Sequence, residues 1–256
     1  MDAVIVTYNS SGDLGRLLAS EVTVDSFDRI VVVDNASTDD TAEVAERAGV
    51  ELVRLDHNLG LAAAINLGFR RTSGQAFALL NPDVRVNAAG DVERLARHLA
   101  DERVGAVAPA LVLPDDSLQD SARWTPTPFD LVARRISGED RGAVRATEPV
   151  GVDWAVAAFL ILQRSAFERI GGFDESYFLY FEDVELGHQL RAAGYTIVYD
   201  PTVRVRHDHA AASRGSLLAA ATRHHMRSAT RFYLRHPRSM LPRRRRLAGT
   251  SRSGAG

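Results

Sequence analysis

Residues 29–39 read RIVVVDNASTD, and this stretch decides the fold. Residues 30–33 are an unbroken β-branched run, which is typical of a parallel strand buried on both faces. Asp34 ends the run, and it is followed by Asn, Ser and Thr residues of the kind that cap the start of a helix. An acid at the carboxyl end of a parallel strand also stands where α/β sheets bind ligands. A ligand site and a plain capping cluster are both compatible with this stretch.

The same alternation of strand and helix continues on both sides of this stretch. Apolar runs predict strands at residues 3–7, 29–34, 51–55, 76–80 and 104–109, and helical periodicity predicts helices at residues 11–20, 38–48, 61–72 and 92–100. Because strands alternate with helices, we expect residues 1–110 to form an α/β unit around a parallel sheet.

The second half of the chain has a different pattern. Residues 113–150 contain four prolines and little periodicity, which predicts a long loop, and long loops in compact domains are often functional. Beyond this loop we expect strands at residues 154–162, 195–199 and 203–206, and helices at residues 164–170, 182–193 and 216–234. The residues from Pro237 onward are expected to be disordered.

The formal net charge of -2 hides two oppositely charged parts. Residues 203–256 hold 13 arginines and one acid, whereas the first 202 residues hold 18 arginines and 32 acids. Arg223, Arg227, Arg231 and Arg235 recur every four residues, so they form one stripe of a basic amphipathic helix. Such a helix can lie on an anionic membrane or dock on the acidic body of the same protein. The tetra-arginine at 243–246 can also bind nucleic acid, but nothing else in the chain resembles a nucleic-acid module, so we expect no such partner.

Composition excludes several classes of protein. A hydrophobic content of 45% supports a core and rules out a wholly disordered chain. The absence of cysteine excludes a disulfide scaffold, a thiolate zinc site and a cysteine nucleophile. No apolar run approaches the ~20 residues that span a bilayer, and Met1 and Asp2 lead straight into a strand without a signal peptide. We therefore expect a cytoplasmic protein.

Three further groups of polar residues stand at strand ends or helix starts. Asp83, in the Asn-Pro-Asp turn at 81–83, can hold Mg²⁺ or Mn²⁺, although an ordinary turn is the alternative. Glu182 and Asp183 open a helix behind aromatic residues, where burial makes a carboxylate a usable base; stabilisation of the helix dipole is the alternative. His207 at a strand end is either a metal ligand or a surface histidine. The absence of GxGxxG and P-loop patterns argues against dinucleotide oxidoreductases and P-loop kinases.

The order of the motifs is more specific than any one of them. VIVTYNS (4–10), VVVDNASTD (31–39), NLGLAAAINLG (58–68), LLNPDV (79–84), VDW (152–154), GGFDESYFLYFEDVELGHQLRAAGY (171–195) and VRH (205–207) follow one another in the chain. This succession resembles the family 2 glycosyltransferases of the GT-A fold, and within them the bacterial rhamnosyltransferases. The resemblance implies a Rossmann-like, mostly parallel central sheet flanked by helices. The implied organisation is a catalytic domain at 1–212, with a nucleotide-sugar half at 1–110 and an acceptor half at 111–212, followed by a basic helix and tail at 213–256.

The resemblance also implies roles for single residues. Donor contacts are expected from Thr7, Tyr8, Asn9, Asp34, Asn35, Ser37, Asn58, Gly60, Asn66 and Asn81, with Asp34 recognising the nucleobase. Asp83 and His207 are expected to hold a divalent cation, Mg²⁺ or Mn²⁺, and the first acid of the family's DxD motif is Asn81 here. Asp183 is the expected catalytic base with Glu182 beside it, and Asp153 and Trp154 are expected near the acceptor.

The implied reaction is an inverting, metal-dependent transfer of L-rhamnose from dTDP-rhamnose to a GlcNAc-diphospho-polyprenol in cell-wall or surface polysaccharide synthesis. The arginine-rich helix would place the enzyme on the inner face of the cell membrane. One alternative is another nucleotide sugar, such as UDP-galactofuranose or UDP-GlcNAc, used for O-antigen or capsule. A second alternative is a non-catalytic nucleotide-sugar-binding protein, against which the intact acids argue. A homodimer also stays open.

Overall fold

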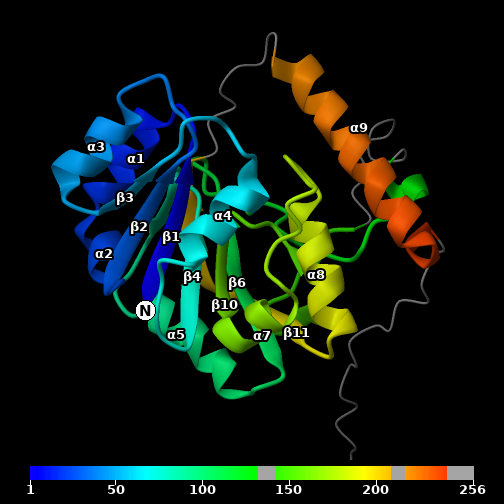
Figure 1. Cartoon of the computed structure of the whole chain (residues 1–256). Coiled ribbons are helices and arrows are strands. Elements are labelled where there is room, and N and C mark those ends of the chain that lie inside the picture. The colour runs from blue at the N-terminus through cyan, green and yellow to red at the C-terminus, as the bar shows by residue number, and fades with distance from the viewer. Residues whose placement is uncertain (132–141, 209–216, 241–256) are drawn as a thin grey trace, which may run out of the picture.

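One large mixed sheet forms the centre of the molecule, with helices on both of its faces (Figure 1). The computed structural model describes residues 1–131, 142–208 and 217–240. Within these residues the strand order is β3-β2-β1-β4-β10-β6-β11-β5, with β8 paired to β11. The predicted α/β class and the flanking helices are confirmed.

The first half of the sheet is parallel. Its strands are β1 (Asp2–Thr7), β2 (Arg29–Asp34), β3 (Glu51–Arg54) and β4 (Ala76–Leu80), and its helices are α1 (Ser11–Leu18), α2 (Glu21–Asp25), α3 (Thr41–Ala48) and α4 (Leu61–Phe69). Parallel pairing places the carboxyl ends of β1 and β2 side by side, with Thr7 opposite Asp34. The sequence pattern predicted these strands closely but did not indicate the short helix α2.

The second half of the sheet is mixed. Its strands are β5 (Val84–Val86), β6 (Val104–Val112), β8 (Val150–Val152), β10 (Phe159–Gln163) and β11 (Thr196–His207), while β7 (Ala122–Arg123) and β9 (Trp154–Ala155) pair separately. Its helices are α5 (Asp91–Ala96), η1 (Arg97–Ala100), α7 (Arg164–Arg169) and α8 (Glu182–Ala192), followed by α9 (Leu217–Arg235) and η2 (Pro237–Met240).

Several predictions for this second half need correction. Four of the eight strand pairings described in the large sheet are antiparallel, so "mostly parallel" holds for the first half alone. The two short strands predicted before residue 207 are one strand, β11, with a register shift between Asp200 and Arg204. The strand predicted at 154–162 is interrupted after Ala155. Residues 237–240, predicted as disordered, form η2, and residues 241–256 lie outside the described residues.

The core lies on both faces of the sheet. Val4 of β1 packs in one cluster with Ile65 of α4, whereas Ile5 packs on the other face with Leu14 of α1. Alternate side chains of a strand point to opposite faces, so a strand covered on both faces must be apolar at every position. This double burial explains why the parallel strands are continuous apolar runs in the sequence.

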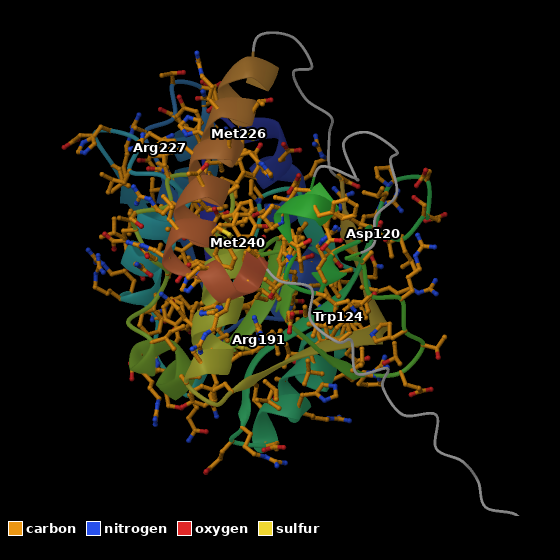
Figure 2. All side chains as sticks on the ribbon, turned by 90° about the vertical axis from the view of Figure 1, so that its right-hand side faces the viewer. Asp120, Trp124, Arg191, Met226, Arg227 and Met240 are labelled. Carbon is orange, nitrogen blue, oxygen red and sulfur yellow. The ribbon has the colours of Figure 1, made fainter. Side chains whose placement is uncertain are left out.

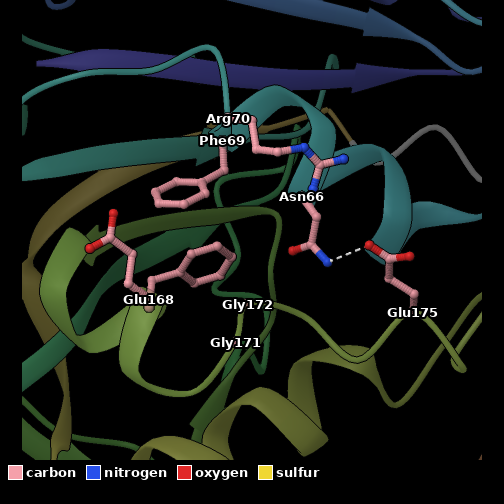
Figure 3. Close-up of a pocket in the computed structure, with 8 residues that line it drawn as sticks. Asn66, Phe69, Arg70, Glu168, Gly171, Gly172 and Glu175 are labelled. Carbon is pink, nitrogen blue, oxygen red and sulfur yellow. Dashed lines mark hydrogen bonds between the residues drawn. The ribbon is translucent and has the colours of Figure 1, made fainter.

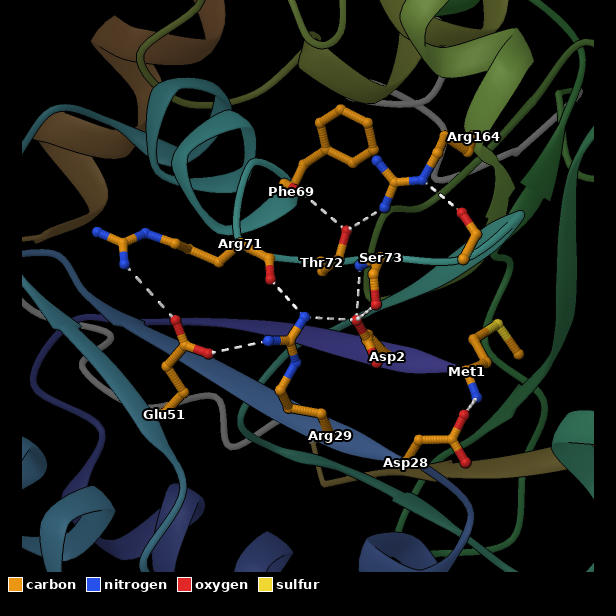
Figure 4. A network of polar contacts seen from close by, with 11 residues as sticks. Met1, Asp2, Asp28, Arg29, Glu51, Phe69, Arg71, Thr72, Ser73 and Arg164 are labelled. Carbon is orange, nitrogen blue, oxygen red and sulfur yellow. Dashed lines mark hydrogen bonds and ion pairs between the residues drawn. The ribbon is translucent and has the colours of Figure 1, made fainter.

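Ionic contacts join the amino ends of β1 and β2 (Figure 4). The Arg29 guanidinium lies 2.8 Å from Asp2 Oδ2 and 3.4 Å from Glu51 Oε2, and the Ser73 N–H donates to Asp2 at 2.7 Å. Burial alone would raise the pKa of Asp2, but hydrogen bonds from Arg29 and Ser73 outweigh burial and lower this pKa below its usual value. The network lies at the opposite end of β1 and β2 from Thr7 and Asp34, so we assign it a structural role.

Candidate active site

The loops that follow β1 and β2 are hydrogen-bonded to each other. The Asn9 N–H donates to Ser37 Oγ at 2.9 Å, and the Thr38 N–H donates to Asn9 Oδ1 at 2.7 Å. Asn9 and Ala36 have φ values of 50° and 65°, a conformation that is costly for residues other than glycine and persists where the surroundings hold it. Two predicted donor contacts, Asn9 and Ser37, therefore shape the rim of the site through bonds to the neighbouring loop.

Asp34 is a fully buried carboxylate at the end of β2. Its Oδ1 accepts from the Ser37 N–H at 3.2 Å, while its Oδ2 has no hydrogen-bond partner among the described residues and lies 4.0 Å from Arg54 Nε. A buried polar atom without a partner calls for an explanation, and a missing ligand is one. Thr7 is buried opposite Asp34, whereas the Tyr8 ring is 51% exposed. The open carboxylate oxygen and the exposed ring suit a planar ligand that carries an N–H donor.

A second polar network joins the end of β2 to the loop before α4. The Asn35 amide donates to Asn58 Oδ1 at 3.0 Å and to the Gly60 carbonyl at 3.2 Å. Gly60 has a φ of +87°, and the Leu61 N–H beside it donates to the Phe178 carbonyl at 2.9 Å. Three predicted donor residues, Asn35, Asn58 and Gly60, are thus brought together and connected to the segment that precedes α8.

Asn66 is engaged with a different part of the chain (Figure 3). Its side-chain N–H groups donate to the Phe173 carbonyl at 2.9 Å and to Glu175 at 3.0 Å, and its Oδ1 accepts from the Phe173 N–H at 2.9 Å. It borders a pocket of about 180 Å³ that is also lined by Phe167 of α7. Both ends of its amide hold the loop after α7, which gives Asn66 a structural role, and its predicted donor contact stays a prediction.

Strands β5 and β11 bring Asp83 and His207 together. The Asp208 N–H donates to the Asp83 carbonyl at 2.8 Å, and His207 Nε2 lies 3.2 Å from Asp83 Oδ1. On the other side of the ring, His207 Nδ1 lies 2.5 Å from Gln119 Oε1, which fixes the orientation of the imidazole. Gln119 comes from the segment predicted as a long loop, and no sequence signal beyond that prediction marks it.

The Asp83–His207 pair suits a divalent cation. Two ligands at right angles, each about 2.1 Å from a metal, are about 3.0 Å apart, which is close to the 3.2 Å between these atoms. A carboxylate oxygen and an imidazole nitrogen form a donor set that Mn²⁺ accepts. Within residues 1–131, 142–208 and 217–240, no three or more His, Cys, Asp or Glu side chains lie close enough together to hold a metal ion. A cation here would therefore complete its coordination with phosphate oxygens or water.

Two acids open α8 in a buried environment. Glu182 is 5% exposed, and its Oε2 has no hydrogen-bond partner in the described part of the chain. Burial raises the pKa of Glu182, and repulsion from Asp183 raises it further. Burial also raises the pKa of Asp183, although the N–H groups of Val184 and Ala157 and the charge of Arg123 oppose the rise. Carboxyl groups with raised pKa values are suited to proton transfer near neutral pH.

The backbone directly before these acids is strained. Tyr180 and Phe181 both have a φ of +67°, which costs about 1–2 kcal/mol for each residue other than glycine. Phe181 is buried in a hydrophobic cluster with Trp154 and with Phe232 of α9. Packing of this cluster therefore holds the chain in the shape that leads into α8.

The turn between β9 and β10 joins the two acids to the Asn81 turn. The Ala157 backbone is near enough to the Asp183 carboxylate to oppose the rise of its pKa, and the Asn81 N–H donates to the Ala158 carbonyl at 2.8 Å. Both alanines are buried. The predicted base and the predicted metal turn are therefore connected through two adjacent residues.

Asp153 and Trp154, the predicted acceptor residues, hold α8 in place. Asp153 Oδ1 lies 3.1 Å from the Arg191 guanidinium of α8, and its Oδ2 accepts from the Thr125 N–H at 2.8 Å. Trp154 is 9% exposed and packs against α8 at Gly187, where a β-carbon would lie 2.6 Å from Trp154 Cβ. The structure thus places both residues under the helix that carries the acids, and sequence reasoning missed Arg191.

Helix α9 packs across the second half of the chain (Figure 2). Phe232 and Tyr233 are buried, and the Tyr233 hydroxyl donates to the Pro126 carbonyl at 2.9 Å. Nearer the start of the helix, the Ser228 hydroxyl donates to the Leu179 carbonyl at 3.0 Å. Helix α9 therefore contacts both the segment after β7 and the strained segment before α8.

The predicted arginine stripe of α9 is divided between the body and solvent. Arg231 donates to the Ser176 carbonyl at 2.6 Å, and Arg235 pairs with Asp174. These two contacts agree with the alternative of docking on the protein's own body. Arg223 and Arg227 are exposed, and the tetra-arginine at 243–246 lies outside the described residues.

Comparison with known proteins places the chain in a family. Residues 2–171 match the profile of "Glycosyl transferase family 2". The chain belongs to this family of glycosyltransferases. The enzyme is 32% identical to the N-acetylglucosaminyl-diphospho-decaprenol L-rhamnosyltransferase of Mycobacterium tuberculosis (strain ATCC 25618 / H37Rv), over 84% of its own chain and 78% of that protein. It is 25% identical to the rhamnosyltransferase WbbL of Escherichia coli (strain K12), over 91% of its own chain and 92% of that protein.

Solved structures confirm the GT-A fold of the enzyme. The crystal structure of GalNAc-T7 with UDP, GalNAc and Mn²⁺ superposes with a TM-score of 0.65 at 19% identity. The match covers 94% of the enzyme and 51% of GalNAc-T7, so the chain spans about half the length of that protein. Among the residues that the structure describes, no helix is both long enough and apolar enough to cross a membrane.

Proposed function

We propose that the enzyme transfers L-rhamnose from dTDP-rhamnose to an N-acetylglucosaminyl-diphospho-polyprenol. The sugar and the acceptor are inferred from the mycobacterial relative, whose name contains both the L-rhamnosyl group and the lipid-linked GlcNAc. The structural observation that supports transfer chemistry best is the buried pair Glu182–Asp183, because its raised pKa values suit a group that must accept a proton.

The strand-end loops form the proposed nucleotide site. Asp34 Oδ2 is buried and has no hydrogen-bond partner among the described residues, so it can accept the imide N–H that a thymine base presents. The exposed Tyr8 ring offers a stacking surface for the same base. The networks of Asn9 with Ser37 and of Asn35 with Asn58 preorganise the rim, which reduces the entropy lost when the donor binds.

Asp83 and His207 form the proposed cation site. Mg²⁺ or Mn²⁺ bound there would neutralise charge on the departing diphosphate. Gln119 accepts the hydrogen bond from His207 Nδ1 and so leaves Nε2 to face Asp83. The Mn²⁺ in the GalNAc-T7 structure is consistent with this assignment.

Asp183 is the proposed general base. It accepts the proton of the acceptor hydroxyl while that oxygen bonds to the anomeric carbon. The bond from this carbon to the diphosphate breaks on the opposite face, so the anomeric configuration inverts. Glu182 is more deeply buried and is destabilised further as an anion by Asp183, so we propose that Glu182 keeps its proton at neutral pH.

The exposed side of α9 is the proposed membrane contact. Arg223 and Arg227 are exposed, and Met226 between them is 62% exposed; Figure 2 labels Met226 and Arg227 on this helix. Each arginine near an anionic surface contributes about 1 kcal/mol of binding free energy. A polyprenol acceptor resides in a membrane, so peripheral binding at the inner face of the cell membrane would place the site beside its acceptor.

A donor panel tests this function. The purified enzyme is incubated with Mn²⁺, a short-chain GlcNAc-diphospho-lipid, and dTDP-rhamnose, UDP-galactofuranose or UDP-GlcNAc, and products are identified by mass spectrometry. We expect one rhamnose to be added from dTDP-rhamnose and no transfer from the UDP-sugars. Transfer from a UDP-sugar alone would overturn the proposed donor, and donor binding without any transfer would favour a non-catalytic binding protein.

A further inference from the structure

The C-terminal end of α9 contacts α8, the helix that carries the two acids, through a buried polar group. His236 follows α9 directly, and its Nε2 lies 2.9 Å and 3.1 Å from the two carboxylate oxygens of Glu185. Glu185 is 3% exposed and stands on α8 one turn after Glu182. The Tyr177 hydroxyl donates to the same carboxylate at 3.0 Å. One buried acid is therefore bonded both to the segment before α8 and to the C-terminal end of α9.

The bond between Tyr177 and Glu185 closes a loop around the two acids. Tyr177 starts the segment that contains the strained residues Tyr180 and Phe181 and then leads into Glu182 and Asp183. Strained backbone persists where its surroundings fix it, and a bond across the loop is such a constraint. The side chains of Tyr177 and Glu185 therefore act on the stretch whose shape sets the direction of the acids.

Residues of α9, and His236 after it, make further contacts near the bond between Tyr177 and Glu185. The guanidinium groups of Arg231 and Arg235 lie 6.0 Å and 5.9 Å from the centre of the Tyr177 ring. The His236 ring lies 3.8 Å from that of His188, which also belongs to α8. These contacts hold His236 beside Glu185, and they connect α9 to the segment that starts at Tyr177 and leads into the two acids.

We propose that Tyr177, Glu185 and His236 form a positioning triad that sets the geometry of the Glu182–Asp183 pair. The proposal rests on the proposed function, in which Asp183 is the base. Without His236 the buried Glu185 carboxylate loses one of the two hydrogen-bond partners that it has among the described residues, so its bond to Tyr177 is no longer held in place. A displacement of the base by about 1 Å can slow transfer about 100-fold. Donor binding depends on the β1 and β2 loops and should not change.

Variants of His236 test the proposal in the full-length enzyme. His236→Ala removes the bond to Glu185, whereas His236→Gln keeps an N–H donor, and Thr230→Ala is a control at an exposed position of α9. We expect His236→Ala to lower kcat about 10- to 100-fold with donor affinity unchanged within about twofold. His236→Gln should recover most of kcat, and Thr230→Ala should behave as wild type. Donor affinity is measured by calorimetry, and folding by thermal unfolding.

Tyr177→Phe is a second test that does not depend on how His236→Ala folds. It keeps the buried ring and removes the hydroxyl, so we expect the same selective loss of kcat. Equal losses in His236→Ala and His236→Gln would overturn the triad, because ring packing rather than the bond would then be responsible. Unchanged kcat in Tyr177→Phe would also overturn it. An active wild type with unaffected variants overturns the triad alone, whereas a wild type without transfer overturns the proposed function and the triad with it.

Discussion

Gly60 and Phe178 are packed so closely that no side chain fits at Gly60. A β-carbon there would lie 2.7 Å from the Phe178 carbonyl oxygen, and the Leu61 N–H already donates to that oxygen. Gly60 belongs to the network of Asn35 in the proposed donor site, and Phe178 belongs to the segment before the two acids. The proposed donor loop and the segment that leads into the two acids are therefore in direct contact, and a clash introduced at Gly60 is transmitted to that segment.

Gly60→Ala tests the importance of this contact. The new methyl group collides with backbone, and alanine at a φ of +87° is strained, so we expect kcat to fall about 100-fold as the acids are displaced. Gly49→Ala is the matched control, because Gly49 has a φ of +69° and a β-carbon added there would meet nothing within 4 Å. That variant should lose about 1 kcal/mol of stability and keep its activity. Equal activities of the two variants would contradict a role for the Gly60–Phe178 contact.

The two acids of α8 should respond differently to amide substitution. Asp183→Asn removes the proposed base, so kcat at neutral pH should fall by about 10²- to 10⁴-fold. Glu182→Gln mimics the protonated side chain that we propose for Glu182, so it should keep most of the activity. The acid limb of wild-type kcat should lie well above pH ~4, where an ordinary aspartate titrates, because the pKa of Asp183 is raised. Steady-state rates across pH decide the assignment, and an active Asp183→Asn enzyme would refute it.

Glu182 should also make stability depend on pH. A carboxyl group whose pKa is raised on folding favours the folded state below its unfolded pKa of about 4.3 and loses that contribution as pH rises through the folded pKa. Glu182→Gln removes the buried charge, so it should stabilise the protein by about 1–3 kcal/mol at pH 9 and far less at pH 5. Urea unfolding at the two pH values measures the difference, which should vanish in an exposed control such as Glu46→Gln.

Parts of this architecture could be predicted from local sequence, and the reason is double burial. Strands β2 and β4 have the predicted bounds because a parallel strand covered on both faces must be a continuous apolar run, which stands out from the polar residues that flank it. The second half was harder to predict because the direction of a strand depends on which distant strand it pairs with. The antiparallel pairing of β10 with β4 and β6 leaves no local mark in the sequence.

The candidate site shows the same limit. Motif order indicated the acids of α8 and the pair Asp83–His207, and the structure brings each pair together. The motifs could not show that Asn66 and Asp153 would be engaged with Phe173 and Arg191, because those contacts depend on tertiary packing. The four-residue repeat of arginines in α9 likewise could not show which of them would contact the rest of the protein.

Removal of the divalent cation should abolish transfer, and Gln119 should tune its affinity. Chelation with EDTA followed by added Mn²⁺ should remove and restore activity if Asp83 and His207 hold the cation. Gln119→Ala removes the acceptor at His207 Nδ1, so the Mn²⁺ concentration for half-maximal kcat should rise about 10- to 100-fold. Gln75→Ala, at a site away from this pair, is the control. An unchanged Mn²⁺ requirement in Gln119→Ala would show that His207 does not depend on this contact for metal binding.

Membrane binding should depend on the exposed arginines of α9 and not on those that contact the body. Arg223→Gln combined with Arg227→Gln removes two exposed charges, which should weaken binding to vesicles of anionic phospholipid by about 2 kcal/mol, or about 30-fold. Arg47→Gln combined with Arg97→Gln removes the same charge from exposed positions on α3 and η1, so it controls for net charge. Cosedimentation at low and high salt measures the affinity, which should fall with salt in the wild type. If both double variants bind alike, the tail or another surface holds the enzyme on the membrane, and α9 contributes only its contacts with the catalytic body.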